Sequence, residues 1–220
     1  DVARTVGAAN TLVRDGSGWF ATNTDVAGVR GAIEELRSGA EGEASRDLEG
    51  SRVVVIGGGG TVRPVLYSLG NDFGVAEVDV INRSDKSDDL RDVVEAAGLR
   101  MRFHTFDELC SDAPGLSQNQ QGLTELVSGA ALVVSTVPSV ALQGMEQALA
   151  QAPEVLLLDE PFSQTDSFLK NNIRQNLFAF VKAHQITTLV ATHESQESLG
   201  FSDRIMILRE GKQLLIDIPE

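Results

Sequence analysis

Short apolar runs alternate with longer amphipathic stretches along almost the whole chain. Five runs are dominated by Val, Leu, Ile, Thr and Ala, a pattern typical of strands that are buried on both faces of a parallel sheet. They are residues 52–56, 77–81, 131–135, 155–158 and 187–191. The stretches between them carry apolar residues at helical spacing. Strands separated by helices predict an α/β fold in which βαβ crossovers cover both faces of the sheet.

Weaker patterns complete this prediction. Helices are expected at about 25–37, 62–71, 86–97, 123–128, 141–151 and 167–184, and further strands at 7–13, 18–21 and 100–104. The chain is expected to end in a hairpin of residues 204–208 and 213–216, because Glu210-Gly211 between them favours a turn. The predicted fold class is a Rossmann-like, doubly wound, mostly parallel sheet.

The composition changes near residue 145. Of the 21 glycines 19 precede residue 151, whereas five of the nine phenylalanines and three of the four lysines follow it. Such a shift indicates a domain boundary. We therefore expect three parts, residues 1–36, 50–140 and 145–220, and leave open whether the strands of the last two join one hybrid sheet.

Charge and hydropathy exclude several classes of protein. The net charge of −14 argues against nucleic-acid binding. No apolar run approaches the roughly 20 residues of a membrane-spanning helix, and the first ten residues do not have the pattern of a secretion signal. The lone Cys110 fits a reducing, cytoplasmic setting. A small molecule is the expected partner, and the oligomeric state stays open.

A glycine cluster comes directly after the first strongly apolar strand. Gly57, Gly58, Gly59 and Gly60 lead into Thr61 and a helical stretch, so backbone N–H groups and the helix N-terminus can approach a pyrophosphate. A strict G-x-G-x-x-G motif requires glycine where this chain has Val62, so the motif is a variant. The alternative is a tight turn without a ligand.

The tip of the next strand indicates which dinucleotide would bind. Asn82, Arg83 and Ser84 come after residues 77–81, at the place where NAD-binding proteins usually carry an acidic residue for the ribose hydroxyls. Arg83 instead suits a 2′-phosphate, and Asp79 lies inside the strand, so NADP is the expected cofactor. The alternative for Arg83 is an ordinary surface arginine.

Four motifs, in order, resemble those of shikimate dehydrogenase over about residues 1–140. They are residues 7–13, residues 18–25, the glycine loop with Asn82-Arg83-Ser84, and Ser135-Thr136-Val137-Pro138. The resemblance implies reversible hydride transfer between NADP and the 3-dehydroshikimate/shikimate pair. It also implies that Thr136 lies at the cofactor, that Asn10 and Asp25 bind substrate, and that Thr11 and Asn23 shape the same pocket.

Asp25 is the residue that the resemblance marks as catalytic. It would orient a partner lysine and a substrate hydroxyl for acid–base transfer while the cofactor takes the hydride. A helix N-cap is the other interpretation of Asp25. The family's catalytic lysine belongs to an upstream segment that has no counterpart here, and Lys86 lies beyond the nucleotide-binding strand. We therefore expect impaired catalysis, and whether the chain is an enzyme stays open.

A second constellation lies at and after the strand at 155–158. An apolar strand that ends in Asp159-Glu160 can hold Mg²⁺ and polarise a water molecule, and a later strand ends near His193. Residues 145–220 resemble the Walker B to H-loop part of an ABC-transporter ATPase subunit. The resemblance implies that Asp159 is a metal ligand, that Glu160 and His193 are catalytic, and that Asp166 is the D-loop aspartate. The alternative is a capped strand and a loop histidine.

The chain thus resembles a chimera of two families, whether by recombination or by natural fusion. The glycine loop lacks the Lys-Ser or Lys-Thr of a phosphate loop, and no LSGGQ-like motif is present. His104, His184 and His193 are interpreted as isolated, so no histidine metal cluster is expected. Three hypotheses remain: an impaired NADP-dependent dehydrogenase fragment, an ATP-hydrolysing subunit fragment that binds MgATP, or an inactive scaffold that still binds NADP.

Overall fold

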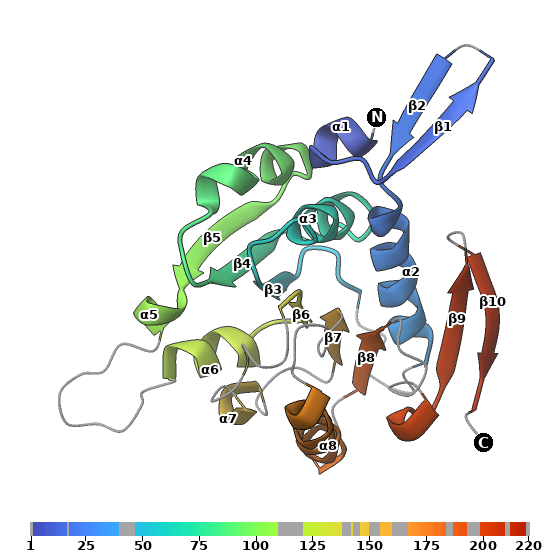
Figure 1. Cartoon of the computed structure of the whole chain (residues 1–220). Helices are drawn as coiled ribbons and strands as arrows, with labels where there is room; N and C mark the ends of the chain where they lie inside the picture. Colours follow the sequence, from blue (N-terminus) through green and yellow to red (C-terminus); the bar gives the residue numbers. More distant parts are fainter. Residues whose placement is uncertain are drawn as a thin grey trace.

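A six-stranded parallel sheet organises the chain in the computed structural model (Figure 1). The structure describes residues 2–16, 18–39, 47–109, 121–137, 142, 146–149, 155–159, 167–183, 187–192, 199–209 and 212–218. The strands are β3 (Arg52–Ile56), β4 (Glu77–Asn82), β5 (Arg100–Thr105), β6 (Leu132–Ser135), β7 (Val155–Asp159) and β8 (Thr187–Ala191). Their order is β5-β4-β3-β6-β7-β8, and every neighbouring pair is parallel. The predicted doubly wound sheet is confirmed, and strands from both compositional parts belong to it.

Helices connect these strands, and two antiparallel hairpins lie outside the sheet. The helices are α1 (Val2–Val6), α2 (Thr24–Gly39), α3 (Val62–Asn71), α4 (Ser87–Ala96), α5 (Phe106–Leu109), α6 (Gln121–Ser128), α7 (Glu146–Leu149) and α8 (Ser167–Ala183). The hairpins are β1 (Thr11–Asp15) with β2 (Gly18–Thr22), and β9 (Ile205–Arg209) with β10 (Lys212–Asp217). Sequence reasoning missed the short helices α1 and α5. It also began the strand at 7–13 too early, because Gly7 is in a turn with φ of 71°.

Each face of the sheet has its own hydrophobic core, because successive strand residues point to opposite faces. Val53 and Val55 pack with α3 and α4 on one face. Val54 and Ile56 pack on the other face, together with α6, α7 and α8. Leu158 of β7 is fully buried in this second core. The late strands therefore share a core with the early ones, as well as a sheet.

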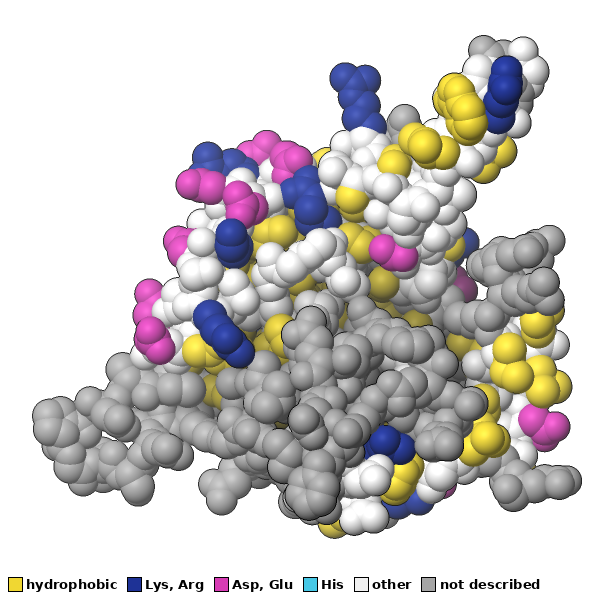
Figure 2. Space-filling view, viewed as in Figure 1, with side chains coloured by type: hydrophobic (Ala, Val, Ile, Leu, Met, Phe, Trp, Pro, Cys, Tyr) yellow, Lys and Arg dark blue, Asp and Glu magenta, His cyan; other side chains and the backbone are white. Residues whose placement is uncertain are grey.

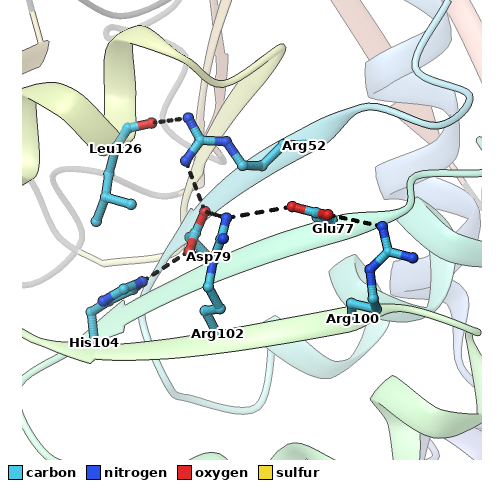
Figure 3. Close-up of polar contacts among 7 residues, drawn as sticks. All are labelled: Arg52, Glu77, Asp79, Arg100, Arg102, His104 and Leu126. Carbon is cyan, nitrogen blue, oxygen red and sulfur yellow. Dashed lines mark hydrogen bonds and ion pairs between the residues drawn. The ribbon is translucent and has the colours of Figure 1, made fainter.

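One buried carboxylate interrupts the otherwise apolar middle of β4 (Figure 3). The Asp79 side chain is 0% exposed and accepts hydrogen bonds from Arg52 Nη1 at 3.1 Å and from Arg102 Nε at 2.8 Å. His104 Nε2 lies 2.9 Å from the same carboxylate, and Arg52 Nη2 donates to the Leu126 carbonyl oxygen of α6 at 3.1 Å. This network ties β3, β4, β5 and α6 together.

The charges around Asp79 determine its protonation. Burial alone raises the pKa of Asp79, but hydrogen bonds from Arg102 and His104 and the charges of Arg102 and Arg52 outweigh it, so the pKa lies below its usual value. Sequence reasoning did not anticipate that His104 contacts a carboxylate. A sequence signal was available, because polar residues at every second position of β5 lie beside Glu77 and Asp79 of β4.

Candidate functional site

The order in which the chain adds strands to the sheet reverses between β3 and β6, and such a place is a topological switch point. Ligands of open α/β sheets bind beside a switch point, at the carboxyl ends of the strands. From β3 the chain builds outward through β4 and β5, and from β6 outward on the other side through β7 and β8. Gly57 comes directly after β3, Asn82 ends β4 and Thr136 comes directly after β6. The structure thus brings three of the predicted cofactor residues to one edge of the sheet.

Gly57 fits this edge because it has no side chain. Its φ is 133°, a conformation that L side chains rarely adopt, and an added Cβ would lie 2.2 Å from Thr136 Oγ1. Its N–H donates to the Ile81 carbonyl oxygen at 2.8 Å. Thr136 in turn donates from its N–H and its hydroxyl to the Ile56 carbonyl oxygen, at 2.9 and 3.2 Å. The start of the loop is therefore fixed between three strands.

The tip of β4 supports the next glycine. An added Cβ on Gly58 would lie 2.6 Å from Asn82 Nδ2, so the loop backbone rests directly against the asparagine amide. Asn82 Nδ2 also donates to the Ser84 carbonyl oxygen at 3.0 Å, which holds the turn after β4 in place. Arg83 and Ser84 are exposed in this turn. The predicted 2′-phosphate residues thus lie beside the glycine loop.

The second half of the loop is open. Gly59 and Gly60 are exposed, and no atom lies within 4 Å of a Cβ added at either position. Thr61 is the N-cap residue of α3, without a side-chain capping bond, and the ten-residue helix begins at Val62. A helix N-terminus carries partial positive charge, so this end of α3 suits a phosphate group.

The predicted substrate residues form a second cluster at the base of the β1–β2 hairpin. Asn10 Nδ2 donates to Asp25 Oδ1 at 2.9 Å, and Asn10 Oδ1 accepts from Thr24 N at 2.9 Å. Asn10 Oδ1 also accepts from the hydroxyls of Thr11 and Thr24, at 3.1 and 3.2 Å. Both Asn10 and Asp25 are exposed, so the pair is accessible to a solute.

The N-cap interpretation of Asp25 is wrong. Asn23 is the cap of α2, because its Oδ1 accepts from Asp25 N at 2.9 Å and its Nδ2 donates to the Ala8 carbonyl oxygen at 3.3 Å. Asn23 is buried in this role. Asp25 lies in the first turn of α2, so its carboxylate is turned to Asn10 and not to the helix backbone.

Sequence reasoning missed Arg63, which connects the two clusters. Its Nη2 donates to Asp92 Oδ2 of α4 at 2.7 Å, and its Nε and Nη1 donate to the carbonyl oxygens of Val6 and Asp89. The Arg63 hydrogen bond lowers the pKa of Asp92 below its usual value. Arg63 thus fastens α1, which leads into Asn10, to α3, which begins at the end of the glycine loop. The sequence did carry a signal for Arg63, because it is the one charged residue of an otherwise uncharged helix, α3.

Most of the predicted ATPase residues lie outside the described part of the chain. Asp159 ends β7, and its backbone lies opposite Ala191 of β8. The Asp159 side chain, Glu160, Asp166 and His193 are outside the described residues. Within the described residues, no group of three His, Cys, Asp or Glu side chains could hold a metal ion. The described helices include none long and apolar enough to cross a membrane.

Solved structures similar to this one include shikimate dehydrogenases. The Mycobacterium tuberculosis enzyme is 30% identical with a TM-score of 0.59, and the comparison covers 86% of this chain and 58% of that one. The Mycobacterium fortuitum enzyme is 28% identical, also with a TM-score of 0.59, over 86% and 57% of the two chains. A Listeria monocytogenes enzyme, solved with shikimate and NAD, is 17% identical with a TM-score of 0.57 and supports the fold alone.

Curated proteins with similar sequences include ATP-binding proteins of ion import. An Fe(3+) ions import ATP-binding protein of Haemophilus influenzae is 41% identical over 75 residues, which are 34% of this chain and 21% of that protein. A sulfate/thiosulfate import ATP-binding protein of Caulobacter vibrioides is 38% identical over 76 residues, 34% and 22% of the two chains. No family model matches the chain. The chain thus spans about a fifth of these proteins and under three-fifths of the dehydrogenases, and the predicted two-parent similarity is confirmed.

Proposed function

We propose that the chain binds NADP at the switch point between β3 and β6, as a fragment similar to shikimate dehydrogenase. The observation that carries the proposal is the convergence of Gly57, Asn82 and Thr136 at one sheet edge, with Arg83 exposed next to them. The pyrophosphate would contact the backbone of Gly58 to Thr61 at the start of α3. Residues 50–140 are the nucleotide-binding part of this proposal.

Arg83 would determine the choice between the two dinucleotides. A guanidinium that contacts the 2′-phosphate forms charge-assisted hydrogen bonds, whereas the 2′-hydroxyl of NADH offers no such charge. A contact of this kind contributes about 1.5–3 kcal/mol, which corresponds to a preference for NADPH of roughly tenfold or more. Ser84 and Asn82 would supply neutral donors beside it.

Asn10 and Asp25 would bind the hydroxyl groups of a small substrate of the 3-dehydroshikimate/shikimate type. The 2.9 Å bond between them orients the Asp25 carboxylate for proton transfer. Lys86, the one lysine of residues 1–150, pairs instead with Asp89 on α4 at 3.1 Å. Among the described residues no lysine contacts Asp25, so for the chain of residues 1–220 we expect turnover reduced by about 10²–10⁴-fold or more.

The acidic charge and single cysteine support a cytoplasmic protein that acts on small molecules.

A titration that follows NADPH fluorescence tests the proposal. We expect NADPH to bind more tightly than NADH, and Arg83→Ala to weaken NADPH about tenfold while NADH binding stays the same. Arg91→Ala is the matched control, because Arg91 is also exposed but lies on α4 and pairs with Asp88. Equal affinities for the two dinucleotides, or equal effects of the two variants, would contradict the assignment of Arg83.

MgATP is the second candidate ligand, because the curated relatives are ATP-binding proteins. It would place Mg²⁺ at Asp159 and use Glu160 and His193 for hydrolysis. The glycine loop lacks the phosphate-loop lysine, so we expect MgATP to compete weakly with NADPH. Tight MgATP binding without any response to NADPH would replace the dehydrogenase proposal with the ATPase one.

A further inference from the structure

Arg63 has a side chain that could contact a phosphate at the start of α3, but the protein itself occupies it. The residue is the second of the helix, next to the open end of the glycine loop. Its guanidinium donates to the carbonyl oxygens of Val6 and Asp89 and to Asp92 Oδ2, so all three of its nitrogen atoms are used by α1 and α4. Arg63 therefore connects helices and is not a free cation for a ligand.

The setting of this contact differs from that of the other ion pairs of α4. The helices α1, α3 and α4 lie side by side (Figure 1). Figure 2 shows acidic and basic side chains gathered over α4, and a typical pair, Arg91 with Asp88, has both side chains more than two-thirds exposed. The Arg63 side chain is only 18% exposed and lies 2.7 Å from Asp92 Oδ2. Exposed pairs hold geometry weakly, so Arg63 is the one suited to fix α1.

A short hydrogen-bonded segment continues from Val6 to the substrate cluster, which is Asn10 with Asp25. The Ala8 N–H donates to a carbonyl oxygen of α1 at 3.1 Å, and the Asn10 N–H donates to one of β2 at 3.2 Å. The Ala8 carbonyl oxygen accepts from Asn23 Nδ2 at 3.3 Å, and Asn23 Oδ1 accepts from Asp25 N at 2.9 Å. A contact at the end of α1 is thus linked to both members of the cluster.

The backbone of Arg63 belongs to the turn that would meet a dinucleotide. The Val62 N–H donates to the Gly59 carbonyl oxygen at 3.2 Å, so the first turn of α3 is tied to the second half of the loop. Little packs against that half, since no atom lies within 4 Å of a Cβ added at Gly59 or Gly60. A phosphate bound to the backbone N–H groups there would remove much of this freedom.

We propose that Arg63 is a positioning residue that couples the two clusters, so that a dinucleotide bound at the glycine loop stiffens Asn10 and Asp25. Ordering one site lowers the entropic cost of ordering a second site connected to it. Such ordering matters for the substrate cluster, because proton and hydride transfer require the reacting groups to be held almost in contact. The inference rests on the proposed NADP site.

Amide hydrogen exchange with and without saturating NADPH tests the coupling without requiring turnover. In the parent chain NADPH should slow exchange in the loop, residues 58–62, and also at the amides of Ala8, Asn10 and Asp25, the latter by roughly fivefold or more. Arg63→Ala should keep the first effect and lose the second, because the guanidinium contacts α1 and α4. A merely structural role would change exchange at these amides by the same factor with and without NADPH.

Gly7→Ala disturbs the same contact from the side of α1. A Cβ at Gly7 would lie 2.8 Å from Arg63 Nη2, where the backbone has φ of 71°, so the arginine side chain must move away. This variant should also lose the effect of NADPH on the substrate cluster. Arg91→Ala is the matched control, because it removes an arginine that pairs with Asp88 on α4, and it should keep both effects.

Three outcomes count against the inference. If NADPH slowed the amides of the substrate cluster as strongly in Arg63→Ala as in the parent, the coupling would not pass through Arg63. If NADPH slowed the loop alone in the parent, the two clusters would be independent and the inference would be overturned, while the proposed cofactor site would stand. If NADPH slowed neither place, the proposed cofactor site would be contradicted and the inference would fall with it.

Discussion

Strands β3 and β7 enter the same sheet in the same way but differ in the residues at their carboxyl ends. Both are five-residue apolar strands with a parallel neighbour on each side. β3 runs into Gly57 and Gly58, which rest against Thr136 and Asn82, whereas β7 ends at Asp159 opposite Ala191. The comparison shows that a strand can join a sheet through its apolar pattern alone, whereas a tightly held loop at its carboxyl end requires particular residues in the neighbouring turns.

The largest effect is expected from a change that tests whether β7 and β3 belong to one folding unit. Leu158→Ala removes a fully buried side chain from the core shared with Ile56, and should lower the free energy of unfolding by about 2–5 kcal/mol. Hydrogen exchange is the measurement, because a shared unit requires the amides of β3 to lose protection together with those of β7. Unchanged protection of β3 would show two independent units.

The second prediction tests what is particular about the turn after β3. Gly57→Ala should destabilise the chain by about 2–4 kcal/mol, because a Cβ meets Thr136 Oγ1 at 2.2 Å in a backbone conformation with φ of 133°. Gly60→Ala is the matched control, since a Cβ there meets no atom within 4 Å. Urea unfolding followed by circular dichroism compares the two. Similar midpoints would mean that the loop is not held as the structure shows.

The third prediction concerns the charged network behind the turn. Asp79→Asn should cost about 1–3 kcal/mol at pH 7, since it leaves Arg52 and Arg102 without their carboxylate. The pKa of Asp79 is lowered in the folded chain, so its stabilisation is present above about pH 4 and is lost as the pH falls further. Urea unfolding at several pH values should show the difference from the parent shrinking only below that pH. Glu95→Gln, at an exposed position of α4, is the control. If the difference in unfolding free energy between Asp79→Asn and the parent chain stayed the same down to about pH 2, this account would be contradicted.

The smallest effect is expected at the exposed end of the same network. Arg100 Nη2 lies 2.8 Å from Glu77 Oε1, and the hydrogen bond from Arg100 lowers the pKa of Glu77. Both side chains are open to solvent, where an ion pair contributes little. Arg100→Ala should therefore leave the urea midpoint unchanged within error. A loss as large as that of Asp79→Asn would show that the network acts as one unit out to the surface.

The strands and most helices could be predicted because apolar periodicity reports directly on burial, as it does for β3 and β7. Residues whose partners lie far along the chain could not be placed in this way. Arg63 contacts the Val6 carbonyl oxygen, 57 positions away, and local patterns carry no information about such a contact. Short helices such as α5 also escape prediction, because four residues make barely one turn and cannot show a repeating apolar pattern. Thr105 and Glu108 start that helix, since the side chain of each accepts a hydrogen bond from the backbone N–H of the other.

The pairing of β3 with β6 has a consequence for the speed of folding. Thr136 and Ile56, whose hydrogen bond fixes the glycine loop, are 80 positions apart in the chain. Contacts between such distant residues form slowly, because a long loop loses its freedom before any contact compensates for it. The local βαβ unit of β3, α3 and β4 can form earlier. A newly made chain should therefore form this local unit well before the hydrogen bond between Thr136 and Ile56 fixes the start of the glycine loop.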